Sequence, residues 1–182
     1  MRRVAVFGLP GTGKTILAIR LAKMLDAPHH DLDRILFTEN GPLPLEEFRN
    51  QAAQLTSTDS WIVDGNYSKL RDVTWHRADT LVWLDYKLPL IVWRVTCRNL
   101  RRLTNREAAP SGFTWQRAFF SRRSVLSNAV RKWLTNRDRY ARYAAEASAF
   151  GVKVLRFRTP RQAKEWLTEL EATLGDSTEA PA

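Results

Sequence analysis

The stretch FGLPGTGKT, residues 7–15, contains three glycines, one lysine and two threonines within nine positions. An apolar run over residues 3–7 ends directly before Gly8, the first glycine of the stretch, and predicts a short buried strand. From the end of the stretch onward, apolar residues recur at helical spacing over residues 14–25. The sequence therefore matches the pattern strand–GxxxxGK[ST]–helix in full, flanking elements included, which is the pattern of a phosphate-binding loop (P-loop).

A P-loop predicts a nucleoside triphosphate as ligand. Its glycines let the backbone curl so that amide N–H groups point at phosphate oxygens, and the following helix adds its positive end. Lys14 can reach the β- and γ-phosphates, and the Thr15 hydroxyl is a suitable Mg²⁺ ligand. We therefore expect ATP and Mg²⁺ as cofactors. The loop residues expected to contact the nucleotide are Gly8, Pro10, Gly11, Thr12, Gly13, Lys14 and Thr15.

Two large classes of P-loop protein are excluded by missing motifs. A Ras-like GTPase needs a guanine-reading Asn-Lys-x-Asp, which does not occur in the chain. Helicases and AAA-type motors usually carry an apolar strand that ends in Asp-Glu, but neither Asp64 nor Asp85 is followed by Glu. The arrangement that remains is that of small kinases, with a P-loop, an acceptor-binding segment, an acidic strand end and an arginine-bearing lid.

Strand and helix patterns alternate along the chain. Strands are expected at 29–32, 61–65, 80–85 and 152–157, and helices at 44–56, 89–103, 114–149 (as one or two helices) and 160–174. Such alternation predicts an α/β fold whose five-stranded parallel sheet is covered by helices on both faces. We expect one domain over residues 1–174 and a disordered tail over 175–182.

Three segments resemble a known family. HHDLDRILF (29–37), WIVDGNYS (61–68) and PLIVWRVTCRNLRR (89–102) resemble the DNA topology modulation proteins, which are themselves similar to adenylate kinases. The resemblance covers about residues 1–145. It implies a three-layer P-loop kinase fold with strand order 2-3-1-4-5, and a nucleotide, a nucleoside or another small molecule as phosphoryl acceptor.

Acidic residues at strand ends are the candidates for binding metal and acceptor. By the resemblance, Asp64 is the carboxylate that faces the metal, and Asp85 is the second candidate because it also ends an apolar strand. Asp33 is predicted to orient the acceptor hydroxyl or take its proton, while the role of Asp31 stays open. His29 is expected to pack or to form a hydrogen bond rather than to bind a metal.

Four arginines, Arg94, Arg98, Arg101 and Arg102, have the spacing of one helical face, with no acidic partners at the neighbouring turns. Phosphoryl transfer needs such cations around the phosphate oxygens. The resemblance implies that Arg94 contacts the nucleotide and Arg98 the transferring phosphate, and that Arg137 returns to the site. The predicted catalytic residues are Lys14, Asp33, Arg98 and Arg137.

The acceptor is expected to bind between Asp33, the turn DGNY (64–67) and the segment 34–60, beneath a lid formed by residues 101–123. The lid contains no cysteine, which excludes a zinc-bearing lid. The residues predicted to contact the acceptor are Asp33, Arg34, Gly65, Asn66 and Arg71.

The net charge of +10 is concentrated in one part of the chain. Thirteen of the 29 basic residues but two of the 19 acidic residues lie between Arg94 and Arg142. Aromatic residues are interleaved with these cations, a pattern typical of nucleic-acid surfaces. A nucleotide-dependent DNA- or RNA-binding module therefore stays an alternative to a kinase, as does a regulatory ATPase.

The remaining composition sets broad limits. The single cysteine, Cys97, excludes an internal disulfide framework and favours a reducing, cytoplasmic location. The longest apolar stretch, residues 81–95, is interrupted by charges and a proline, so no membrane partner is expected. The sequence leaves the oligomeric state open.

Overall fold

A computed structural model of the chain describes residues 1–104 and 125–178. The strands are β1 (Arg3–Gly8), β2 (His29–Asp31), β3 (Phe37–Thr38), β4 (Gly41–Pro42), β5 (Trp61–Asp64), β6 (Thr80–Leu84) and β7 (Lys153–Phe157). The α-helices are α1 (Lys14–Met24), α2 (Leu32–Leu36), α3 (Leu45–Leu55), α4 (Leu88–Leu103), α5 (Val125–Ala149) and α6 (Pro160–Thr178). Two 3₁₀ turns, Ser68–Leu70 and Trp75–Arg77, lie between β5 and β6.

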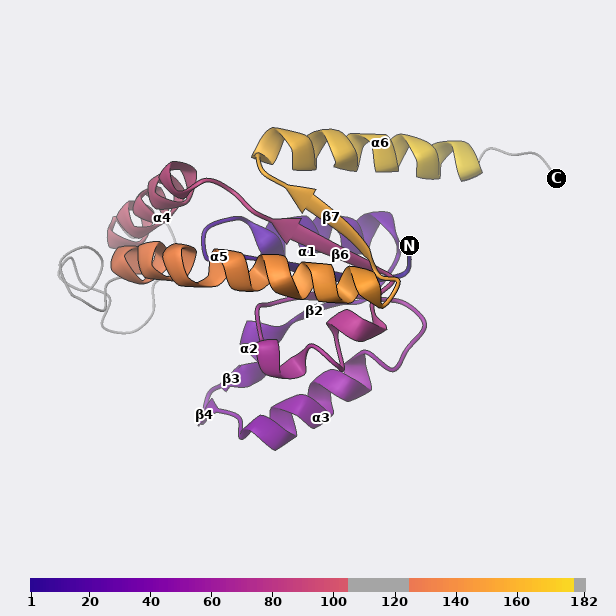
Figure 1. The fold of residues 1–182 in the computed structure, drawn as a ribbon, viewed down its shortest axis with the longest axis horizontal. Helices are drawn as coiled ribbons and strands as arrows, with labels where there is room; N and C mark the ends of the chain where they lie inside the picture. Colours follow the sequence, from indigo (N-terminus) through magenta and orange to yellow (C-terminus); the bar gives the residue numbers. More distant parts are fainter. Residues whose placement is uncertain (105–124, 179–182) are drawn as a thin grey trace.

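Five of these strands form one parallel sheet in the order β2-β5-β1-β6-β7. In chain order this is 2-3-1-4-5, as the resemblance implied. The central strands β1, β5 and β6 are buried nearly throughout because helices cover both faces. In Figure 1, α5 crosses in front of the strands, whereas α1 lies behind them.

An aromatic cluster fixes the packing of α5 on the sheet. The Phe7 ring of β1 lies 4.4 Å from Trp75, 5.8 Å from Trp83 and 5.8 Å from Tyr140 of α5, measured between centroids. Burying one such ring stabilises the fold by about 1.5–3 kcal/mol. Phe7 directly precedes Gly8, so the cluster packs around the end of β1 from which the P-loop begins.

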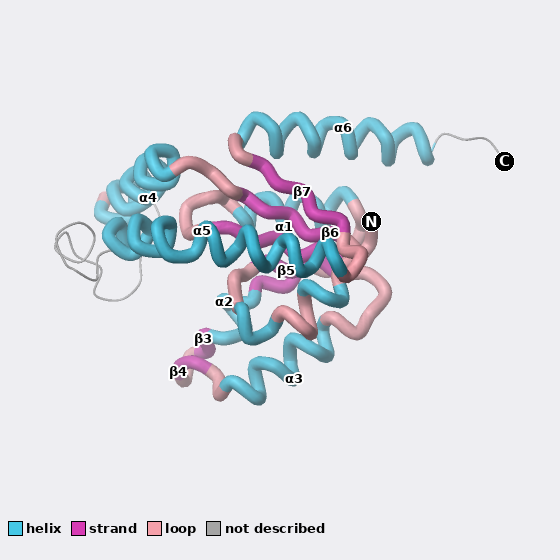
Figure 2. The backbone as a smooth tube through the Cα atoms, viewed as in Figure 1, coloured by secondary structure: helices cyan, strands magenta, loops and turns pink. Residues whose placement is uncertain are grey.

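A small lobe beside β2 is formed by α2, the antiparallel pair β3–β4 and α3, as the tube in Figure 2 shows. The sequence patterns predicted α3 but neither α2 nor the β3–β4 pair. Leu32, expected to end the second strand, instead begins α2, because the Asp31 side chain accepts hydrogen bonds from the backbone N–H groups of Asp33 and Arg34. Asp31, left open by the sequence, is thus an N-cap residue.

At the other end of the chain, α6 ends at Thr178, four residues beyond the predicted end of this helix. Residues 175–178, expected in the disordered tail, are therefore helical. Residues 179–182 lie outside the described part, as do residues 105–124, which contain most of the predicted lid.

Candidate active site

The P-loop begins at the carboxyl end of β1 and depends on its glycines. Gly11 and Gly13 have φ values of +87° and +90°, which side chains other than glycine rarely adopt. A Cβ atom at Gly11 would also lie 2.8 Å from Cγ2 of Val95, so α4 approaches the loop as closely as a glycine allows. The Thr12 hydroxyl donates to the Leu9 carbonyl at 2.8 Å and closes the turn.

Lys14 and Thr15 open α1 and project from its first turn. The backbone N–H groups of that turn have no acceptor within the helix, and they carry the positive end of the helix dipole. The Lys14 amine donates to the Leu9 carbonyl at 3.5 Å, inside the loop. Burial lowers the pKa of Lys14 from its usual value, although the carboxylates of Asp33 and Asp64 oppose this shift. The first turn of α1 thus offers an ammonium group, a hydroxyl and free amides to an anion.

Asp64 lies beside the P-loop at the end of β5. The Thr15 hydroxyl donates to its Oδ2 at 2.6 Å, and Nε2 of His29 lies 2.6 Å from its Oδ1. A hydroxyl and a carboxylate oxygen side by side are the hard ligands that Mg²⁺ prefers, so Thr15 and Asp64 fit such an ion. His29, which the sequence predicted to pack or to form a hydrogen bond, holds the other oxygen of the carboxylate.

Asn66 bonds to the backbone of Gly8. Its Oδ1 accepts from the Gly8 N–H at 3.0 Å, and its Nδ2 donates to the Gly8 carbonyl. The side chain therefore continues the β1–β5 hydrogen bonding beyond the last backbone pair and fixes the first residue of the P-loop. Asn66 was predicted to contact the acceptor; its side chain lines the cavity, but its hydrogen bonds go to the nucleotide loop.

Asp33 lies in the first turn of α2. Its Oδ1 accepts a hydrogen bond from the Tyr67 hydroxyl, and both side chains line the same cavity as Lys14. Tyr67 belongs to the DGNY turn that was expected beside the acceptor, but it was not among the individual site residues predicted from the sequence. The signal that could have found it is its place directly after Asp64-Gly65-Asn66 at a strand end that faces the P-loop.

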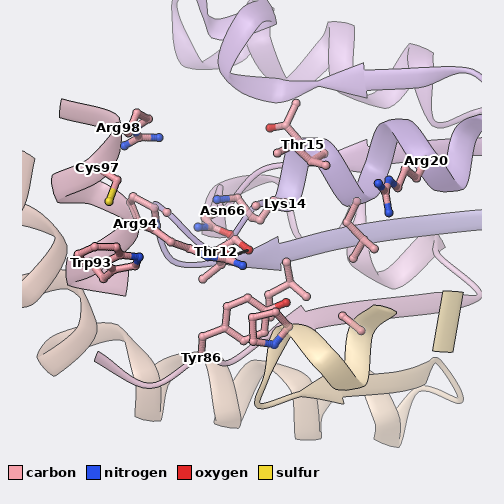
Figure 3. A pocket seen from close by; sticks show the side chains of 18 of the residues that line it. Thr12, Lys14, Thr15, Arg20, Asn66, Tyr86, Trp93, Arg94, Cys97 and Arg98 are labelled. Carbon is pink, nitrogen blue, oxygen red and sulfur yellow. Dashed lines mark hydrogen bonds between the residues drawn. The ribbon is translucent and has the colours of Figure 1, made fainter. Parts of the chain in front are cut away.

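Arg94 and Arg98 of α4 lie on one side of the P-loop residues Thr12 and Lys14 (Figure 3). Nη1 of Arg94 donates to the Thr12 carbonyl at 2.9 Å, and the guanidinium lies 5.4 Å from the centroid of the Tyr86 ring. Arg98 and Arg101 line the cavity from the next turns of the helix. Three of the four arginines of the expected cationic face, Arg94, Arg98 and Arg101, therefore line the cavity.

These groups share one cavity of about 1030 Å³. It extends from the P-loop between α4 and the start of α6, and it also reaches Asp33. Its polar lining consists of Thr12, Lys14, Thr15, Arg20, Asp33, Asn66, Tyr67, Tyr86, Arg94, Arg98, Arg101, Lys132 and Lys164. The space thus has room for a nucleotide together with a small second substrate, and its lining is rich in cations.

Arg137, predicted to be catalytic, lies elsewhere. Its Nε donates to Oδ1 of Asp85 at 3.3 Å, and its guanidinium lies 5.4 Å from the Trp133 ring centroid. Asp85 also accepts from Nε of Arg156 at 3.0 Å. Two guanidinium groups therefore neutralise Asp85, the second metal candidate, and they engage Arg137 in the same ion-pair cluster.

The structure does not bring Arg71 to the cavity. Its Nη1 lies 2.6 Å from Oε2 of Glu146 on α5, and its guanidinium stacks 3.8 Å above the Tyr143 ring centroid. Arg71 therefore joins the turns after β5 to α5.

Two further residues predicted on the acceptor side have other surroundings. Arg34 is exposed on α2 and does not line the cavity. Gly65 is buried, and a Cβ atom there would lie 2.8 Å from Cβ of Leu32. Gly65 therefore allows β5 and the start of α2 to pack closely.

The described residues limit what else the chain can hold. Residues 1–104 and 125–178 contain no group of three or more His, Cys, Asp or Glu that could bind a metal ion. In the same ranges, none of the helices combines the length and apolar character needed to span a bilayer.

No protein-family model matches the chain, and no curated protein is similar to it in sequence. Solved structures are similar in fold. A shikimate kinase from Acinetobacter baumannii in complex with shikimate has a TM-score of 0.55 at 17% identity, with 100% of this chain and 96% of that chain covered. A shikimate kinase from Aquifex aeolicus has a TM-score of 0.55 at 14% identity, covering 98% and 99% of the two chains.

A gluconokinase from Sinorhizobium meliloti 1021 is also similar, with a TM-score of 0.50 at 15% identity over 98% of this chain and 94% of that chain. These comparisons give no support to the narrower resemblance to DNA topology modulation proteins. At such identities the likeness concerns the fold, and the chain has the fold of the small P-loop kinases.

Proposed function

We propose that the chain is an ATP-dependent small-molecule kinase, which transfers the γ-phosphoryl group of ATP to a hydroxyl of a small acceptor. The observation that carries this proposal is that Asp33 lines the same cavity as the P-loop and its Lys14. A nucleotide-binding ATPase or switch needs only the first of these features. Transfer to an acceptor hydroxyl needs, in addition, a carboxylate near the end of the triphosphate that can take the proton of this hydroxyl.

On the nucleotide side, the amides of the P-loop and of the first turn of α1 would hold the β- and γ-phosphates, with Lys14 between them. Thr15 and Asp64 would hold Mg²⁺, which when bound supplies positive charge to the phosphate oxygens. Arg94 fixes the P-loop from the Thr12 carbonyl, and Arg98 would contact the transferring phosphate.

On the acceptor side, Asp33 would accept a hydrogen bond from the acceptor hydroxyl and take its proton during transfer. The acceptor oxygen forms a bond to the γ-phosphorus. The bond between that phosphorus and the oxygen that bridges it to the β-phosphorus breaks, and ADP leaves with this oxygen. The acceptor would lie between Asp33, Asn66 and the lobe formed by residues 34–60. Arginine on α4 suits the binding of the transferring phosphate better than lysine would, because its planar guanidinium fork binds two phosphate oxygens at once.

The proposal is tested by acceptor-dependent release of ADP. Mg-ATP is offered with a panel of nucleosides, nucleoside monophosphates, D-gluconate, shikimate and simple alcohols. We expect at least one acceptor to raise ADP release well above the rate with water alone. Release that no acceptor increases would contradict the kinase and leave an ATPase.

A pair of lysine variants on one helix makes the test specific to the P-loop. Lys14→Ala should abolish ATP binding and turnover, because it removes the ammonium group from the phosphates. Lys23→Ala, in the exposed last turn of α1, should leave both unchanged. Turnover retained by Lys14→Ala would contradict the proposed site.

A further inference from the structure

We infer that Tyr67 is a positioning residue for Asp33: its hydroxyl holds one carboxylate oxygen so that the other faces the acceptor hydroxyl. This inference rests on the proposed function and adds a residue to it. It is carried by the contacts of Tyr67 on both ends of its side chain and by the exposure of Asp33.

The Tyr67 ring is itself held in place. It meets the ring of Phe48 edge-on, at 5.0 Å between centroids and 82° between planes. Phe48 belongs to α3 and is buried, with 2% of its surface exposed. Because a fully packed ring anchors Tyr67, the position of its hydroxyl is set by the core and not by solvent.

The Tyr67 hydroxyl acts as a donor to Asp33. Burial and the neighbouring Asp33 carboxylate raise the pKa of Tyr67, so its hydroxyl keeps its proton across the range in which enzymes work. The hydroxyl donates a hydrogen bond to Oδ1 of Asp33. Within residues 1–104 and 125–178 no donor bonds to Oδ2, so this oxygen can accept from a second hydroxyl group, which is the arrangement that an acceptor requires.

The backbone and the side chain of Asp33 are fixed by different partners. The Asp33 N–H donates to Oδ1 of Asp31 at 2.9 Å, which places the residue in the first turn of α2. Its side chain is exposed, and among residues 1–104 and 125–178 the hydrogen bond recorded for it is the one from Tyr67. Without this bond, rotation about the side-chain torsions would move the carboxylate away from the phosphate.

Two adjacent residues thereby connect the two substrates. Asn66 bonds to Gly8 in the nucleotide loop, and Tyr67 bonds to Asp33 on the acceptor side. The separation between phosphate and acid is consequently set by one short piece of backbone after β5. Such fixed geometry is worth orders of magnitude in rate when a bond must form over a short distance.

The test compares Tyr67→Phe with Tyr143→Phe, using Mg-ATP and the acceptor from the panel that supports the fastest turnover. Tyr143 is a matched control, because its ring also meets another aromatic ring near edge-on, Trp75 at 6.0 Å and 70°, and it does not line the cavity. We expect Tyr67→Phe to lower kcat about tenfold, as the loss of a hydrogen bond to a charged group would. KM for ATP and the melting temperature should stay near those of the unchanged protein. Tyr143→Phe should change neither kcat nor KM.

A double-mutant cycle with Asp33→Asn separates positioning from a merely structural role. If Tyr67 acts through Asp33, Tyr67→Phe has little further effect on kcat in the Asp33→Asn background. Equal losses in both backgrounds would overturn the inference, as would a Tyr67→Phe enzyme with unchanged kcat. If the unchanged protein phosphorylates no acceptor, the proposed function itself fails, and the inference fails with it.

Discussion

A buried aspartate lies at the carboxyl end of each strand beside β1, yet the two carboxylates have different partners. Asp64 follows the apolar residues of β5, and Asp85 follows those of β6; each side chain is 3% exposed. Asp64 contacts the Thr15 hydroxyl and the His29 ring. Asp85 contacts the guanidinium groups of Arg137 and Arg156. The same sequence pattern has thus produced a candidate metal ligand on one side and an ion-pair cluster on the other.

The difference arises from what lies over each strand end. The N-terminus of α1 brings a hydroxyl to Asp64, and a hydroxyl can share a cation with the carboxylate. Asp85 lies toward β7, where its N–H donates to the Phe157 carbonyl at 2.9 Å and Arg156 approaches across Trp83, 4.2 Å from the ring centroid. A carboxylate that two guanidiniums already neutralise has little attraction left for a metal ion. Neighbours distant in sequence, rather than the strand itself, therefore decide the role of each acid.

Between these two strand ends, the largest expected effect comes from Asp64→Asn. The amide removes the negative charge beside Thr15, so turnover with Mg-ATP should fall about a hundredfold. The free energy of unfolding should change by less than about 1 kcal/mol, because the amide can still accept the Thr15 hydrogen bond. Steady-state kinetics and urea unfolding measure the two quantities. An Asp64→Asn enzyme with normal turnover would remove the functional half of the comparison.

Asp85→Asn should have the opposite profile. It leaves two partly exposed guanidiniums facing a neutral amide, so the free energy of unfolding should fall by about 2 kcal/mol, less than for a fully buried pair. Turnover per folded molecule should stay within about twofold of normal, since Asp85 does not line the cavity. Asp72→Asn is the control: it breaks the exposed pair with Arg49 and should cost less than about 1 kcal/mol. If Asp85→Asn abolished turnover without loss of stability, the two carboxylates would have to exchange roles.

The comparison also explains how far the sequence alone could lead. The P-loop was predictable because its glycines, Lys14 and Thr15 lie within nine contiguous positions. The parallel α/β sheet was predictable because strand and helix patterns alternate along the chain. Asp64 and Asp85 look alike in the sequence, however, and the resemblance rather than the residues ranked them. The partners of Asp85 are 52 and 71 residues away, a separation that periodicity cannot bridge.

The acceptor side was harder to predict for a related reason. The β3–β4 pair is short, and α2 depends on a cap from Asp31, so neither has the periodic signal of a long element. Arg71 and Arg137 looked like ligands for anions because their acidic partners, Glu146 and Asp85, are remote in sequence. A cation pattern predicts that an anion is near, but it does not tell a substrate from a side chain.

His29 provides a finer test of the Asp64 side. Its Nε2 holds the carboxylate oxygen that does not face Thr15, so His29→Ala should let Asp64 rotate. We expect the Mg²⁺ concentration for half-maximal turnover to rise about tenfold, the lower end of the effect of partners that orient metal ligands. A magnesium titration at saturating ATP measures this shift. His30→Ala, one position along on β2, should leave the titration unchanged; an equal shift in both variants would mean that β2 as a whole had been disturbed.

The smallest effect concerns the amino ends of the same strands, where Asp79 precedes β6. Its Oδ2 accepts from the N–H groups of Arg2 at 2.7 Å and Arg3 at 2.9 Å, and it thereby ties the start of β1 to β6. Partial burial raises the pKa of Asp79, but these hydrogen bonds, with that of the Thr80 hydroxyl, outweigh it and leave the pKa below its ordinary value of 3.8. A carboxyl with a lowered pKa in the folded state stabilises the fold above its unfolded pKa and loses that contribution as pH falls through the folded one.

Asp79→Asn should therefore lower the free energy of unfolding by about 1 kcal/mol near neutral pH, because the amide oxygen accepts the same hydrogen bonds without the charge. The difference from the unchanged protein should shrink as the pH falls below about 4 and vanish once Asp79 is protonated in the folded state. Urea unfolding at several pH values, with the exposed Asp59→Asn as control, measures the gap. A gap that stayed constant at low pH would show that the amide disturbs packing and not charge. Unlike Asp64, Asp79 lies far from the P-loop edge of the sheet, so turnover at neutral pH should be unaffected. Asp79, at the amino end of β6, would then act on stability alone.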